Sequence, residues 1–471
     1  MEGRVPLEPT GGEIRALTEE ALAYLVAFSN RRRNAPAADF DGVDALLERV
    51  RQPAPEAGRP LADLLELVAA ATAKGHDTTG DGWLAYIPGG GLFSAALADF
   101  IARTTNRFVG VWEAAPVVAE LEATAIRWLC ALFNLPPGAR GTLTTGGSIA
   151  TFSAVVTARH ALLGENFLDG TIYVTSETHG AIAKAAALAG FPRANVRVVP
   201  TTPELRMDVG LLRDTIDHDR AAGFRPCMVV ATAGTTNTGA IDDIEALVEV
   251  SRESRLWLHV DAAYGGFFHL TERGRRRFAG IDQADSIVLD PHKGLFLPYG
   301  TGALLVRDGQ KLRAAHEIHG PYLRDLAPEG EIPNFADYSP ELSRDARGLR
   351  LWMPILLHGL AAFRDALDEK LDLARHLYEE LRAIPGLEVP WEPELSIVGF
   401  RCARDDAGDA DTATTALLER INRSGRVFVS TTAVNGRTTI RVCILSVHTH
   451  RDRIDELVEL VREAAADSLP P

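Results

Sequence analysis

The stretch Ser286-Ile-Val-Leu-Asp-Pro-His-Lys293 decides the fold, because an apolar run typical of a buried strand ends abruptly in polar and strand-breaking residues. A similar stretch precedes it in His259-Val-Asp-Ala-Ala-Tyr264, where an apolar run ends at Asp261. The interval between the two runs has room for one helix. A strand–helix–strand step of this kind places Asp261 and Lys293 at the same edge of a parallel sheet.

The same alternation extends outward over residues 95–310. Helical periodicity occurs at 181–189, 209–217 and 244–252, between short apolar runs rich in strand-forming residues. Those runs lie at 171–175, 196–199, 227–231, 256–260, 286–289 and 303–306. Apolar strands that alternate with helices predict an α/β fold with a mostly parallel sheet flanked by helices.

Polar residues follow four of the predicted strands. Because ligands of such sheets bind beyond the carboxyl ends of the strands, these residues are expected to share one crevice. They are His179, Thr236, Asp261 with Ala263, and His292 with Lys293. A lysine at the end of an apolar strand is expected to be partly desolvated, which favours the neutral amine that forms Schiff bases.

Two glycine runs could bind an anion. Gly146-Gly147-Ser148 precedes a long helical stretch, and the free N–H groups at a helix start attract a phosphate. Gly89-Gly90-Gly91 also precedes a helical stretch and competes for the same role. The hydroxyl of Ser148 favours the first run.

Together these groups match the needs of pyridoxal 5'-phosphate (PLP), namely a phosphate site, a carboxylate for the ring nitrogen and a lysine for the aldehyde. The two strand-end motifs, with Gly234-Thr-Thr236, resemble the group II PLP-dependent decarboxylases. This family includes the aromatic-L-amino-acid, glutamate and histidine decarboxylases. The resemblance runs over residues 70–460 and includes Trp83-Leu-Ala-Tyr-Ile-Pro88, residues 112–129 and Gly348-Leu-Arg-Leu-Trp352.

The resemblance implies fold type I of the PLP-dependent enzymes and a role for each matching residue. Lys293 would bind the cofactor covalently, Asp261 would pair with the pyridine nitrogen, and His179 would stack on the ring. The remaining cofactor-binding residues that it implies are Gly147, Ser148, Thr236, Ala263 and His292. Lys293 and His179 are also expected to be catalytic. The resemblance further implies Tyr338 as the proton donor on a loop within 325–347, with Tyr322 as the second candidate.

The substrate pocket is less well matched. The resemblance points to Tyr86, Ile87, Pro88, Phe108 and Gly110, the last two at the pocket of a partner subunit. Three features depart from the aromatic decarboxylases of animals. Asp290 replaces an asparagine near the phosphate, Gly294 replaces a tryptophan, and Gly110 replaces a bulky residue. Arg441 matches a family arginine, which either supports the site or forms a surface ion pair.

The chain is expected to divide into a helical dimerising segment (1–94), a large PLP-binding domain (95–347) and a small C-terminal α+β domain (348–471). The first segment is too thin to bury its own apolar face, and the family implies a homodimer. Strands at 397–402, 427–430 and 439–444 are expected in the last domain, with helices at 412–423 and 452–465.

Composition limits the partners of the 471-residue chain. A net charge of −15 argues against nucleic acid. No apolar run reaches the length of about 18 residues that a membrane helix needs, and no signal sequence is evident. Four widely spaced cysteines predict buried free thiols, no metal site is expected, and a cytoplasmic location follows.

The expected activity is PLP-dependent decarboxylation of an L-amino acid, aromatic by default, to an amine and CO₂. One alternative is decarboxylation coupled to oxidative deamination, which gives an aldehyde and which the family favours when its loop tyrosine is replaced. A second is a non-catalytic protein that has kept the PLP fold.

Overall fold

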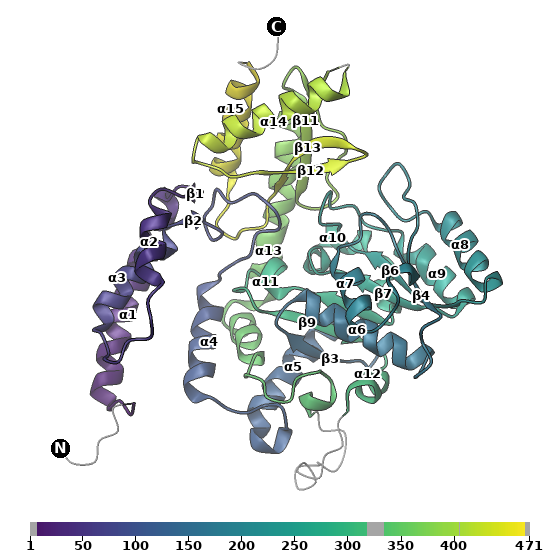
Figure 1. The fold of residues 1–471 in the computed structure, drawn as a ribbon, viewed down its shortest axis with the longest axis horizontal. Helices are drawn as coiled ribbons and strands as arrows, with labels where there is room; N and C mark the ends of the chain where they lie inside the picture. The colour runs from purple at the N-terminus through teal and green to yellow at the C-terminus, as the bar shows by residue number, and fades with distance from the viewer. Residues whose placement is uncertain (1–6, 318–333, 405, 467–471) are drawn as a thin grey trace.

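A computed structural model describes residues 7–317, 334–404 and 406–466 (Figure 1). Its centre is a seven-stranded sheet with the order β3-β9-β8-β7-β6-β4-β5. The strands are β3 (Arg140–Thr144), β4 (Gly170–Val174), β5 (Val196–Val198), β6 (Arg225–Thr232), β7 (Trp257–Asp261), β8 (Ser286–Leu289) and β9 (Gly302–Val306). β9 is antiparallel to β3 and β8, and the other pairs are parallel, which confirms the predicted mostly parallel sheet.

Register aligns the carboxyl ends of the central strands. Thr232 of β6 lies beside Asp261 of β7, which in turn lies beside Val288 of β8. Because β9 runs the opposite way, Ala303 at its beginning pairs with Leu289 at the end of β8. The start of β9 therefore reaches the edge at which β6, β7 and β8 end.

Helices cover both faces of this sheet (Figure 1). Alternate residues of β7 enter different apolar clusters, with Leu258 and Val260 on one side and Trp257 on the other. This double burial explains the continuous apolar runs in the sequence. The helices of this region are α5 (Pro116–Leu132), α6 (Gly147–Leu162), α7 (Ala181–Leu188), α8 (Val209–Ala221), α9 (Ile244–Ser254), α10 (Glu272–Arg277), α11 (Pro291–Gly294) and α12 (Gly309–His316).

The N-terminal helices lie beside the body and bury none of their residues. They are α1 (Gly11–Arg31), α2 (Val43–Val50) and α3 (Leu61–Thr72), with β1 (Ala38–Asp39) and β2 (Gly75–His76) paired between and after them. The next helix, α4 (Phe93–Thr105), packs against α13 (Gly348–Arg382). α13 is interrupted at Gly359, whose φ of +74° breaks the helical path.

The C-terminal region contains a four-stranded antiparallel sheet with the order β10-β11-β13-β12. Its strands are β10 (Leu387–Glu388), β11 (Ile397–Cys402), β12 (Ser430–Val434) and β13 (Arg437–Cys443), covered by α14 (Ala407–Arg423) and α15 (Arg451–Ala466). The strand predicted at 427–430 is wrong, because Phe428 forms only an isolated bridge with Trp83 and the strand begins at Ser430. The boundaries at 94 and 347 stay predictions.

None of the helices in the described ranges is long and apolar enough to cross a bilayer. All four cysteines are buried and unpaired, as the sequence predicts. Burial raises the pKa of the Cys130 and Cys227 thiols to about 12 each, so both stay protonated at neutral pH.

A buried ion pair holds the end of β3. Arg344 Nη2 lies 2.5 Å from Glu122 Oε1, and both side chains are at most 1% exposed. Arg344 also donates to the Leu143 carbonyl at 3.0 Å, and the Gly348 N–H donates to Glu122 Oε2 at 3.2 Å. The pair thus joins α5, the beginning of α13 and the strand that leads into Gly146-Gly147-Ser148.

We predict that Glu122→Leu destabilises the protein by about 3–5 kcal/mol, because it leaves the Arg344 guanidinium buried without its counter-charge. The double variant Glu122→Leu/Arg344→Leu should be more stable than the single variant. Urea denaturation followed by circular dichroism measures both. A single variant as stable as wild type, or a double variant less stable than the single one, would contradict this prediction.

Candidate active site

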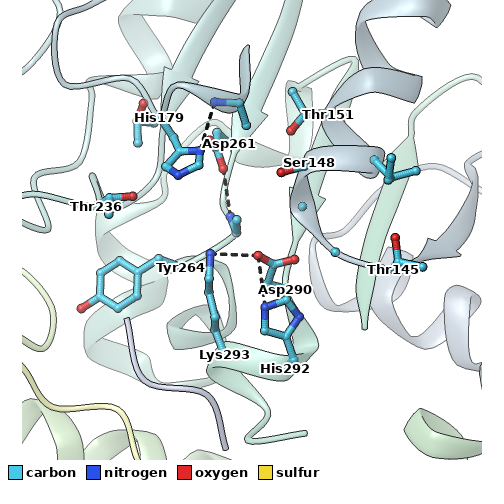
Figure 2. A pocket seen from close by; sticks show the side chains of 17 residues that line it. Thr145, Ser148, Thr151, His179, Thr236, Asp261, Tyr264, Asp290, His292 and Lys293 are labelled. Atoms are coloured by element: carbon cyan, nitrogen blue, oxygen red, sulfur yellow. Dashed lines mark hydrogen bonds and ion pairs between the residues drawn. The ribbon is translucent and has the colours of Figure 1, made fainter. Parts of the chain in front are cut away.

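A cavity of about 260 Å³ opens at the carboxyl ends of the parallel strands (Figure 2). All eight residues predicted to bind the cofactor line it, namely Gly147, Ser148, His179, Thr236, Asp261, Ala263, His292 and Lys293. They come from loops far apart in the sequence, which the sheet brings to one edge. Their roles stay predictions, but their convergence is a property of the fold.

Lys293 points into the cavity from α11, the single turn that follows β8. Its Nζ lies 2.8 Å from Asp290 Oδ2, one helical turn earlier, and the Asp290 side chain is only 4% exposed (Figure 2). The sequence led us to expect a lysine in largely apolar surroundings. The structure instead gives the ammonium a buried carboxylate partner.

His292 faces the start of the reversed strand. Its Nδ1 lies 2.6 Å from the Thr301 carbonyl, which fixes the proton of the neutral ring on Nδ1. Burial is the main cause that lowers the pKa of His292, and Asp290, 3.7 Å from Nε2, opposes that shift. A neutral His292 therefore adds no positive charge to the cavity near pH 7.

Asp261 ends β7 and is 7% exposed. Burial raises the pKa of its carboxyl group, while the charges of Lys293 and His179 and the Ala263 N–H, at 3.2 Å from Oδ1, act in the opposite direction. A carboxylate in this setting gains most from a nearby cation, such as a protonated ring nitrogen.

His179 lies in the loop between β4 and α7. Its Nδ1 accepts the Ala181 N–H at 3.2 Å, so the proton of the neutral ring sits on Nε2. The sequence left open whether this histidine caps a helix or serves a site. It does both, because the same ring lines the cavity.

The two glycine runs have different surroundings. Gly147 begins α6, so the N–H groups of Gly147 and Ser148 have no carbonyl partner within the helix, and both residues line the cavity. A Cβ on Gly147 would lie 3.0 Å from Asp290 Oδ2. In the competing run, a Cβ on Gly90 would overlap the Phe296 backbone, and the Gly90 N–H donates to the His292 carbonyl at 3.2 Å. That run packs against the lysine loop and has no space for an anion.

Arg441 of β13 holds two segments together. It is 3% exposed, and its guanidinium donates to the carbonyls of Asn237 (3.1 Å), Tyr86 (2.6 Å) and Thr236 (2.6 Å). No carboxylate among the described residues lies within ion-pair distance of it, so the surface ion-pair interpretation is wrong. Arg441 connects the C-terminal sheet to the cavity wall at Thr236 and to the segment that begins at Tyr86.

Several predicted residues do not line this cavity. Tyr338 is buried at 9% exposure in an apolar cluster with Ala150 and Ala154 of α6, where it cannot reach a ligand without unpacking. The alternative donor, Tyr322, lies outside the described residues. The five substrate-pocket candidates, Tyr86, Ile87, Pro88, Phe108 and Gly110, are also absent from the lining.

Nine further residues line the cavity, and four of them carry hydroxyl groups, namely Thr145, Thr151, Thr232 and Tyr264. Thr232 is the last residue of β6, and its Oγ1 is buried with no hydrogen-bond partner. The strand-end rule could have found it, because Thr232 directly follows the strand predicted at 227–231. Tyr264 donates or accepts a hydrogen bond with Ser396 Oγ at 2.8 Å, which no local pattern reveals.

Comparison with known proteins gives consistent results. Residues 45–403 match the model of the pyridoxal-dependent decarboxylase conserved domain. The chain is 31% identical to an aromatic-L-amino-acid decarboxylase of Bacillus atrophaeus, over 98% of this chain and 97% of the relative. It is 26% identical to a phenylacetaldehyde synthase of Arabidopsis thaliana, over 82% of this chain and 81% of that one. The crystal structure of Oryza sativa TDC with PLP and tryptamine matches with a TM-score of 0.94 and 26% identity, over 99% of this chain and 100% of the other.

Proposed function

The chain belongs to the pyridoxal-dependent decarboxylase family, and from that premise we propose that it converts an aromatic L-amino acid to its amine and CO₂. It is a carboxy-lyase, and its cofactor is PLP. The observation that carries the proposal is the convergence of Lys293, Asp261 and His179 on one cavity with the glycine turn of α6. The aromatic substrate class rests on the relatives described above.

The residues of the cavity fit PLP. The free N–H groups at the start of α6 and the Ser148 hydroxyl suit the phosphate, and the orphan Thr232 Oγ1 offers a further polar group. Asp261 suits a protonated ring nitrogen, and Lys293 is the only lysine or arginine among the lining residues. Lys293 would hold the aldehyde carbon, and Ala263 and His179 would lie against the ring.

When bound, PLP supplies an electron sink for the pair released from the Cα–carboxylate bond. The chain's own residues orient that chemistry. Asp261 holds a negative charge, 7% exposed, where the ring nitrogen would sit, and so stabilises positive charge there. His179 presents its Nε2–H, because Nδ1 is engaged by Ala181, and can hold or pass a proton at the cavity mouth.

Lys293→Ala should abolish the adduct that borohydride fixes between protein and PLP, because no other amine lines the cavity. CO₂ release from L-tryptophan, L-tyrosine or L-phenylalanine should fall at least about a thousandfold. Lys184→Ala, an exposed lysine on α7, is the matched control and should behave as wild type. Covalent PLP on Lys293→Ala after reduction would show that the lysine assignment is wrong, and a wild type that releases CO₂ only from other amino acids would reject the aromatic class.

The outcome of the reaction, amine or aldehyde, depends on the proton donor. Because Tyr338 is packed against α6, we propose Tyr322 for this role in place of Tyr338. The chain is similar both to a decarboxylase and to an aldehyde synthase, so relatives of this chain include enzymes named for each of the two outcomes. Retention of a loop tyrosine favours the amine.

We expect Tyr322→Phe to raise the share of aldehyde, because loss of the donor leaves the carbanion unprotonated and open to oxygen. Oxygen uptake and hydrogen peroxide release measure that share directly. Tyr338→Phe should leave the products unchanged, since its hydroxyl lies outside the cavity. If Tyr338→Phe changed the products and Tyr322→Phe did not, the original assignment of Tyr338 would be restored.

We also propose a homodimer in which α1–α3 pack on the partner. Leu22, Leu25 and Val26 of α1 are each about half exposed, and no residue of these helices is buried within one chain. Resemblance to the family favours a second copy of this chain as the partner that covers these exposed side chains. The same association would bring Phe108 and Gly110 to the partner's cavity. We further propose a cytoplasmic location, because the four unpaired cysteines are typical of a reducing compartment.

Light scattering of wild type should give twice the chain mass of 50.9 kDa. Leu22→Asp/Val26→Asp should shift the protein toward the monomer, because it places two charges in the apolar contact. Leu168→Asp, at an exposed leucine remote in sequence from the N-terminal helices, is the control. A monomeric wild type, or a double variant that dimerises as tightly as wild type, would contradict the arm-exchange proposal.

A further inference from the structure

Asp290 is a buried carboxylate that the mechanism above does not use. It follows β8 directly and is 3% exposed. Oδ2 pairs with Lys293 Nζ at 2.8 Å, whereas Oδ1 has no hydrogen-bond partner although it is buried. Figure 2 shows the carboxylate between Lys293 and the glycine turn of α6. A Cβ on Gly147 would lie 3.0 Å from Oδ2 and 3.2 Å from Oδ1.

This position puts a negative charge against the turn that would hold the cofactor's phosphate. The titratable groups that line the cavity are His179, Asp261, Tyr264, Asp290, His292 and Lys293. Burial lowers the pKa of His292, so its ring is neutral near pH 7. Lys293 is the only lysine or arginine among the lining residues. The lining residues therefore offer the phosphate amide and hydroxyl donors but no arginine or second lysine.

The only close cation of Asp290 is the group that must react with the cofactor. To reach the aldehyde carbon, Lys293 has to leave its 2.8 Å contact with Asp290. A phosphate bound at the glycine turn would then lie close to this carboxylate, with only one glycine residue between them. Two like charges in a buried site repel each other more strongly than they would in water.

We propose that Asp290 weakens the hold of this chain on the phosphate of PLP, so that the cofactor exchanges readily with solution. The inference rests on the proposed function of the cavity as the PLP site. It gives the enzyme a built-in dependence on the concentration of free PLP. A residue without charge at position 290 would remove that dependence.

The test compares PLP with pyridoxal, which has the same aldehyde and ring but no phosphate. Asp290→Asn should lower the dissociation constant of PLP about tenfold, because removal of a single close charge is worth about one decade. The dissociation constant of pyridoxal should change less than about threefold. Absorbance of the cofactor adduct and quenching of tryptophan fluorescence measure both constants without turnover. Asp308→Asn, an exposed N-cap residue of α12, is the control for net charge.

Weaker or unchanged PLP binding by Asp290→Asn would overturn the proposal. An equal gain in affinity for PLP and pyridoxal would also overturn it, because it would mean that Asp290 acts on the lysine alone. A measurement on wild type needs no variant. Its phosphate should improve binding over pyridoxal by only about tenfold, and a gain of about a thousandfold, as several charge-assisted hydrogen bonds would give, overturns the inference. If wild type formed no adduct with either compound, the proposed function of the cavity would fail instead.

Discussion

Parallel pairing of β7 with β8 is the interaction on which the site depends. The pair aligns Asp261 with Val288, so Asp290 and Lys293, which follow β8 within a few residues, emerge at the edge of the sheet where Asp261 ends β7. Neither strand can slip by one residue, because both faces are buried and each side chain would move to the opposite apolar cluster. The distance between the carboxylate for the ring and the amine for the aldehyde is thus set by the core and not by the loops.

Buried cations then fix the loops around this rigid edge. Arg344 holds β3 through the Leu143 carbonyl, just before the glycine turn, and Arg441 holds the loop at Thr236 and the backbone at Tyr86. Arg344 has Glu122 as a counter-charge, whereas Arg441 relies on carbonyl dipoles alone. Arg441 donates from three nitrogens of one planar guanidinium, a geometry that the compact ammonium of a lysine does not offer. The backbone around the cavity is therefore positioned by side chains that do not line it.

The sequence was sufficient for those parts of the site that depend on local pattern. Strand ends predicted Asp261, Lys293, His179 and Thr236, because an apolar run and the polar residue after it are adjacent in the chain. β3 was not predicted, since its short Arg-Gly-Thr-Leu-Thr run is weakly apolar and is defined by its pairing with β9. The contacts of Arg441 required tertiary structure, because its carbonyl partners lie in other segments, and so did the approach of Asp290 to Gly147. The burial of Tyr338 in an apolar cluster with α6 also could not be predicted, because it cannot be read from a polar stretch of sequence.

The reversed direction of β9 has an implication for how the enzyme could diversify. A parallel strand contributes its last residues to the functional edge, whereas β9 contributes its first ones, and Thr301 there accepts from His292. The connection from Lys293 to β9 consequently never leaves the neighbourhood of the cavity, and it also contacts the segment at Gly90. Insertions or substitutions in residues 294–301 would therefore displace the Lys293 turn and the segment at Gly90 together. This short hairpin is thus a point at which selection, natural or in the laboratory, could retune specificity without disturbing the sheet.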